Sequence, residues 1–132
     1  MPNPLYKKLG IKDGFTLKLV NQPADYYLFF DEFPDQVSEA EEGNTKIDFI
    51  HLFIESQKDM FEHFPALAKE IKQNGMIWVS WIKKSASIPT DVDGNFVRAF
   101  GLSTGLVDCK VCSINDKWSA MKFVIRIKDR IK

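Results

Sequence analysis

The sequence lacks three features that would each assign the chain to a broad class. No apolar run approaches the roughly 20 residues of a membrane-spanning helix, so we expect no membrane partner. The 18 basic and 18 acidic residues cancel, so no general positive field attracts nucleic acid. The N-terminal stretch MPNPLYKKLGIKDG has no apolar centre of the kind that a secretory signal needs, which indicates a cytoplasmic protein.

Residues that commonly hold metals or redox centres are also scarce. Cysteine occurs only as Cys109 and Cys112, which are expected to be reduced in a cytoplasm. Their spacing occurs in redox pairs, but here it falls within an apparent strand, where alternation predicts that the two side chains point to opposite faces. His51 lies alone in an apolar segment, a setting more typical of a hydrogen-bonded core residue than of a catalyst. We therefore expect no metal site and no cofactor.

The composition that remains is that of a folded domain. Hydrophobic residues make up 45% of the 132-residue chain and charged residues 27%, a balance typical of soluble globular proteins. This length predicts one domain that spans residues 1–132. Within it, residues 1–13 carry two prolines and a lysine pair, and are expected to form an N-terminal arm.

The remaining hydrophobic pattern alternates between strand-like and helix-like segments. Strands are predicted at Thr16–Val20, 36–41, Lys46–Ile54, 76–81, 107–114 and 119–127. Helices are predicted at Ala24–Glu32, from the N-cap Ser56 to Gly75, and over 90–105 with Thr90 or Asp93 as the cap. This order predicts an α/β domain with a mostly parallel, Rossmann-like sheet, helices on both faces and a C-terminal antiparallel hairpin.

The stretch FPALAKEIKQNGMIWVSW, with the final helix, strand and hairpin, resembles class I S-adenosylmethionine-dependent methyltransferases. The likeness covers the C-terminal two thirds of the chain and implies a shortened methyltransferase frame. In that family the cofactor lies on a Gly-rich turn after the first strand. Here the turn reads LVNQPADYY, which has no glycine, and Pro23 removes a donor. These residues argue against binding of S-adenosylmethionine.

A second resemblance covers nearly the whole chain. The stretches LGIKDG, WVSWIKKSAS with TDV, and GLVDCKVCSINDKWSAMKFV resemble a bacterial family known only as a domain of unknown function, number three-zero-five-two in its series. The resemblance implies a shared fold and brings no activity with it.

The segment MIWVSWIKKSAS suggests where a ligand would bind. In open parallel sheets, ligands bind beyond the carboxyl ends of the strands, and this strand ends in two lysines and small hydroxyl residues. The free N–H groups of the next helix would favour an anion, and a tryptophan of the hairpin would supply a flat wall. The predicted site for a small anion comprises Lys83, Lys84, Ser85, Thr90, Asp91 and Trp118. The alternative is that the lysines only mark the return of the chain to solvent.

Two classes of function follow from this pattern. The favoured one is a non-catalytic domain that binds a small ligand or another protein. The rival is a small transferase or hydrolase that acts on an anionic molecule, with Lys84 or Asp91 as acid or base and Asp116 assisting. The aromatic segment Tyr26–Phe33 could pack in the core or form a surface for a protein partner or for self-association.

Overall fold

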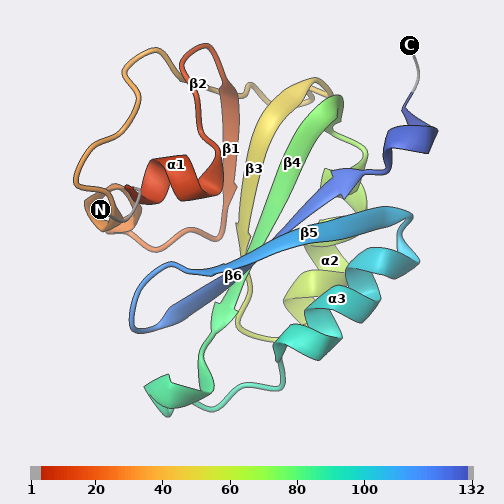
Figure 1. Cartoon of the computed structure of the whole chain (residues 1–132). Helices are drawn as coiled ribbons and strands as arrows, with labels where there is room; N and C mark the ends of the chain where they lie inside the picture. Colours follow the sequence, from red (N-terminus) through yellow and green to blue (C-terminus); the bar gives the residue numbers. More distant parts are fainter. Residues whose placement is uncertain (1–3, 131–132) are drawn as a thin grey trace.

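The computed structural model describes residues 4–130, and within them six strands form one sheet in the order β2-β1-β3-β4-β6-β5 (Figure 1). The strands are β1 (Thr16–Val20), β2 (Ser38–Glu39), β3 (Ile47–Phe53), β4 (Ile71–Ile82), β5 (Leu106–Ser113) and β6 (Trp118–Ile125). The first four pair in parallel, and β6 runs antiparallel to both of its neighbours, β4 and β5. The predicted fold, a single α/β domain with a mostly parallel Rossmann-like sheet, is confirmed.

Helical segments cover both faces of the sheet (Figure 1). Two longer helices, α2 (Gln57–Ala68) and α3 (Gly94–Ser103), pack on one face around a cluster of apolar residues. A short helix, α1 (Leu5–Leu9), and the 3-10 turn η1 (Tyr26–Phe29) contribute to a second cluster, which includes Trp78 and Phe49. Two further 3-10 turns are η2 (Lys84–Ala86) and η3 (Ile127–Asp129). The sheet therefore lies between two separate apolar layers.

Capping side chains define where α2 and α3 begin. The Ser56 hydroxyl accepts a hydrogen bond from the Asp59 amide at 3.3 Å, and the Asp93 carboxylate accepts one from the Phe96 amide at 2.8 Å. Such bonds satisfy amides that have no partner in the first helical turn. Gly105, at φ 96°, follows α3 in the left-handed region that glycine tolerates. The predicted starts of both helices are confirmed.

The predicted role of Gly75 as the end of α2 is wrong. The helix ends at Ala68, and β4 already begins at Ile71, so Gly75 lies inside a strand. The β3–β4 register shifts there, and a Cβ atom on Gly75 would lie 2.7 Å from the carbonyl oxygen of Ile47. The glycine is needed because two backbones approach closely at an irregularity of the sheet.

The N-terminal segment is part of the core and not a free arm. Residues 1–3 lie outside the described residues, but α1 forms directly after them. Leu9 is fully buried, and its carbonyl accepts a hydrogen bond from Trp78 Nε1 at 2.8 Å. The sequence pattern did not reveal this helix because five residues are too few to show a helical period.

Two other predictions need correction. The helix predicted over Ala24–Glu32 is only the 3-10 turn η1, because Phe30 returns to extended backbone. In β5, Val107 pairs with Val124 while Val111 pairs with Met121, and the register shifts between Asp108 and Lys110. Strict alternation therefore does not hold at Cys109, which lies at this irregularity, and both cysteines are free thiols.

Candidate functional site

The segment that carries the predicted lysines lies in the middle of the sheet. β4 runs parallel to β3, which in turn runs parallel to β1, so all three strands end at the same edge. The antiparallel β6 begins at that edge, where Trp118 lies opposite Ile82. The loops after β1, β3 and β4 and the hairpin before β6 therefore meet at this edge, as the sequence predicted. Two separate cavities that matter for the predicted site lie at this edge.

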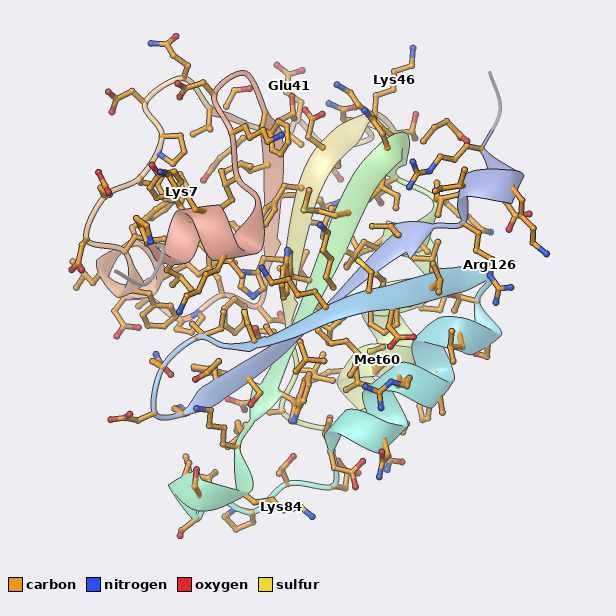
Figure 2. All side chains as sticks on the ribbon, in the orientation of Figure 1. Lys7, Glu41, Lys46, Met60, Lys84 and Arg126 are labelled. Carbon is orange, nitrogen blue, oxygen red and sulfur yellow. The ribbon has the colours of Figure 1, made fainter. Side chains whose placement is uncertain are left out.

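The first cavity, here called the basic cavity, lies between the end of β4 and the start of α3. It has a volume of about 400 Å³, and its lining includes Lys83, Lys84, Ser85, Arg98 and the first residues of α3. Lys83 Nζ donates to Ser113 Oγ at 2.6 Å, and Arg98 Nε donates to Asp108 Oδ2 at 3.0 Å. Figure 2 shows Lys84 where the chain leaves β4 on its way to α3. Three of the six predicted site residues therefore lie together.

Thr90 and Asp91 do not line this cavity. The Thr90 hydroxyl donates to the carbonyl of Glu55 at 2.9 Å. The Asp91 carboxylate accepts from the Gln57 amide at 2.9 Å, and the Gln57 side chain donates to the Asp91 carbonyl at 2.8 Å. Both residues therefore connect the loop before α3 to the start of α2.

Trp118 belongs to the second cavity, here called the aromatic crevice. The crevice has a volume of about 550 Å³ and is lined by Asn21, Gln22, Pro23, Phe53, Glu55, Asp59, Lys117 and Trp118. The rings of Phe53 and Trp118 meet edge to face at 4.9 Å, and Lys117 Nζ lies 5.2 Å from the centre of the Trp118 ring. Asp116 lines a neighbouring hollow of about 460 Å³ that shares Trp118.

The aromatic crevice lies between the ends of β1 and β3, where the strand order reverses. In the sheet, β2 lies on one side of β1, and β3 lies on the other side of β1. Such switch points are the usual ligand sites of open α/β sheets. Asn21, directly after β1, has a φ of 57° and takes the left-handed conformation without being glycine. The sequence predicts that Asn21 lies at this edge, whereas it gives no signal for Phe53, which lies within the apolar run of β3.

A buried chain of polar side chains lies apart from both cavities. The hydroxyl of Tyr26 lies 3.0 Å from His51 Nδ1, and His51 Nε2 lies 2.7 Å from Ser80 Oγ. Tyr26 is the first residue of η1, and all three residues are buried. Desolvation lowers the pKa of His51 to about 3 and raises the pKa of Tyr26. The prediction that His51 is a hydrogen-bonded core residue is confirmed.

The described part of the chain has no metal cluster of the usual kind and no membrane-spanning helix. Between residues 4 and 130, no group of three or more His, Cys, Asp or Glu side chains is arranged to hold a metal ion. No helix in this range is both long and apolar enough to cross a bilayer.

Comparisons with known proteins identify the fold. No protein-family model and no curated protein sequence matches the chain. Solved structures do match, including an S-adenosylmethionine-dependent methyltransferase from Aquifex aeolicus, which has a TM-score of 0.57 and 16% identity over 92% of this chain and 88% of that one.

A TehB-like methyltransferase from Corynebacterium glutamicum has a TM-score of 0.61 and 10% identity over 92% of this chain and 85% of that one. The magnesium protoporphyrin IX methyltransferase of Synechocystis, with bound SAH, has a TM-score of 0.58 and 9% identity over 92% and 78% of the two chains. The chain therefore has the Rossmann-like fold of S-adenosylmethionine-dependent methyltransferases, a likeness of fold alone.

Proposed function

We propose that this domain is a non-catalytic binding module that holds a small anionic molecule in the basic cavity, on a scaffold like that of methyltransferases. The observation that carries the proposal is the position of Lys83 and Lys84 at one cavity of about 400 Å³, beside Arg98, which is already paired with Asp108. Cationic side chains of this kind bind phosphate and carboxylate groups by charge-assisted hydrogen bonds. Lys84 is exposed and makes no ion pair with any described residue, so its ammonium group is available to a ligand.

The short segment between β1 and β3 argues against methyl transfer. It contains one 3-10 turn and a strand of two residues. The turn after β1 has no glycine, so no bare backbone is available there for a cofactor to approach. We propose that the chain has lost the part of the scaffold on which S-adenosylmethionine would rest.

The groups suggested for catalysis do not converge. Lys84 lines the basic cavity, Asp91 is bonded to Gln57, and Asp116 lines the hollow beside Trp118. An acid–base mechanism needs such groups within hydrogen-bond reach of one substrate. This separation supports a binding role over the enzymatic alternative.

The test of anion binding uses the double variant Lys83→Ala/Lys84→Ala and pyrophosphate as the probe. Pyrophosphate at ten times its dissociation constant is expected to raise the melting temperature of the wild type by about 5 °C. The double variant should lose most of this shift. Equal shifts in both proteins, or no shift in the wild type at 10 mM pyrophosphate, would refute the proposal.

Lys46→Ala/Lys69→Ala is the matched control for this test. These two exposed lysines precede β3 and β4 and therefore lie at the opposite edge of the sheet. Figure 2 shows Lys46 and Lys84 at opposite ends of the molecule. The control variant should keep the full shift, which would separate a specific site from a general effect of positive charge.

A small transferase is the second candidate, and the aromatic crevice favours it. The crevice lies at the switch point of the sheet, and the Trp118 and Phe53 rings offer an apolar wall for a planar group. Titration with S-adenosylmethionine, followed by calorimetry, separates the two candidates. We expect no heat of binding, and a dissociation constant below about 100 μM would favour the transferase.

We further propose self-association through part of the Tyr26–Phe33 segment. Tyr26 and Phe30 are buried, whereas Tyr27 and Leu28 are 48% and 84% exposed. Exposed apolar side chains that lie together often mark interfaces. Light scattering at high protein concentration should detect dimers that Leu28→Asp abolishes, and a wild type that stays monomeric would exclude this role.

The two remaining proposals concern relationship and location. The sequence stretches quoted above support membership of the bacterial family of unknown function. The same sequence supports a cytoplasmic location, which fractionation of cells that express the tagged chain would test.

A further inference from the structure

A third cavity lies away from the strand ends, between α1 and the loop that leads from η1 to β2. Its volume is about 480 Å³, within the range of small-molecule sites. In Figure 1 this loop, in orange, runs beside α1. The cavity, here called the α1 cavity, shares no lining residue with the basic cavity or the aromatic crevice.

Apolar side chains form part of both walls of the α1 cavity. Tyr6 and Ile11 line it from the α1 side, and Phe33 and Pro34 line it from the loop. The Phe33 ring packs against Phe30 with their centres 4.9 Å apart, which fixes its position. A preformed apolar pocket of this size can bury an aromatic or large aliphatic side chain.

A hydrogen bond beside the cavity ties its two walls together. The Gln36 amide donates to Asp13 Oδ1 at 3.2 Å. The loop is thereby joined to the turn that follows α1, so the space between them exists before any ligand arrives. A preformed site loses less conformational entropy on binding.

Charges of opposite sign line the two walls. Lys7 and Lys12 come from the α1 side, as does Asp13, whose carboxylate accepts from the Gln36 amide, and Glu32 and Asp35 come from the loop. Lys7, Lys12, Glu32 and Asp35 form no ion pair and no side-chain hydrogen bond with any residue between 4 and 130. The opposite charges lie on the two sides of one cavity and do not pair with each other. A molecule that carries both a positive and a negative charge could therefore bind between them.

We propose that the α1 cavity binds a free α-amino acid that has an aromatic or large apolar side chain. The carboxylate of the amino acid lies toward Lys7 and Lys12, and its ammonium group toward Glu32 and Asp35. Its side chain packs on Tyr6 and Phe33. The proposal is independent of the anion bound in the basic cavity, because the two sites share no residue.

The test compares three probes that differ in charge. L-Phenylalanine carries both charges, 3-phenylpropionate carries only the carboxylate, and 2-phenylethylamine carries only the ammonium group. Binding to the whole chain is followed by heteronuclear NMR titration, which also identifies the residues whose signals shift. L-Phenylalanine should bind about two- to fivefold more tightly than either single-charge probe, as expected for one exposed ion pair.

Two variants then test which side of the cavity binds the carboxylate of the ligand and which side binds its ammonium group. Lys7→Ala/Lys12→Ala should weaken the binding of L-phenylalanine and 3-phenylpropionate by about two- to fivefold and should not weaken the binding of 2-phenylethylamine. Glu32→Gln/Asp35→Asn should instead weaken the binding of L-phenylalanine and 2-phenylethylamine. All four residues are exposed, so the variants should fold normally.

Lys83→Ala/Lys84→Ala is the control and should bind all three probes as the wild type does. The proposal is overturned if L-phenylalanine at 10 mM shifts no signal from residues of the α1 cavity. It is also overturned if both charge variants bind all three probes like the wild type.

Discussion

The two faces of the sheet are stabilised in different ways. On one face, α2 and α3 have 12 and 10 residues, begin with capping side chains and cover a purely apolar cluster. On the other face, α1 and η1 have five and four residues, and Tyr26 of η1 begins the buried chain Tyr26–His51–Ser80. Helices this short do not form alone in water, so the second face depends on specific contacts with the sheet.

Those specific contacts are side-chain hydrogen bonds to the end of α1. Trp78 Nε1 donates to the carbonyl of Leu9 at 2.8 Å, and Lys110 Nζ donates to the carbonyl of Lys8 at 3.0 Å. They satisfy carbonyls that α1 cannot bond internally. The Lys110 bond also gives a structural reason for placing Lys110 directly opposite Lys122, a like-charge pair that would otherwise be unfavourable. Apolar side chains pack on both faces, and the second face differs because polar contacts also position its short helices.

The largest effect is expected from Phe64→Ala on the α2 and α3 face. Phe64 is fully buried and packs against Phe123, with ring centres 5.3 Å apart. Truncation should lower the free energy of unfolding by about 3–5 kcal/mol because it leaves a cavity that the rigid sheet cannot fill. Urea denaturation measures the change. A loss below 1 kcal/mol would show that this face is less tightly packed than the structure indicates.

On the opposite face, His51 is expected to make the free energy of unfolding depend on pH. The pKa of His51 is lowered to about 3 in the folded chain, compared with 6.5 for an ordinary histidine. Between these values the unfolded chain binds more protons, so stability is lost as the pH falls below about 6.5. The expected loss is about 1.4 kcal/mol per pH unit, or about 2 kcal/mol between pH 6.5 and 5.

Urea denaturation at several pH values tests this effect. His51→Gln should reduce the slope of the free energy of unfolding against pH between pH 6.5 and 5. Phe64→Leu should lower the free energy of unfolding at every pH and keep that slope. If His51→Gln retains the wild-type slope, the pH dependence has another source.

The smallest effect is expected from Tyr26→Phe, which removes the hydroxyl that lies 3.0 Å from His51 Nδ1. The loss should be about 1–2 kcal/mol because His51 is left with an unsatisfied ring nitrogen in the core. Tyr27→Phe is the matched control, since the Tyr27 hydroxyl donates to Glu39 at an exposed position and its loss should cost less than about 0.5 kcal/mol. Equal losses in the two variants would show that the buried chain adds nothing to stability.

Local signals in the sequence predicted most of the architecture. The apolar run that contains His51 predicted β3, and the spacing of Ser56 and Asp93 from the following apolar residues predicted the starts of α2 and α3. These signals are strong because each depends on residues only a few positions apart. The end of α2 was wrong because Gly75 is required by a close approach to Ile47, which is distant in sequence.

The candidate site was predicted in part. The sequence placed Lys83, Lys84 and Trp118 at the carboxyl edge, where the structure has them. It could not show that this edge holds two cavities, with the lysines in one and the tryptophan in the other. Nor could it show that Thr90 and Asp91 bond to Glu55 and Gln57, because these partners are 35 and 34 positions away.

The sequence by itself determined the order of the strands and of α2 and α3, the direction of β4 and the edge to which its lysines belong. Hydrophobic period and capping residues encode these features locally. Only the tertiary structure decided that Leu9 and Ile11 enter the core, that Tyr26, His51 and Ser80 meet, and that the α1 cavity exists. Each of these depends on contacts between distant segments, and no local pattern records which surfaces will face each other once the sheet has formed.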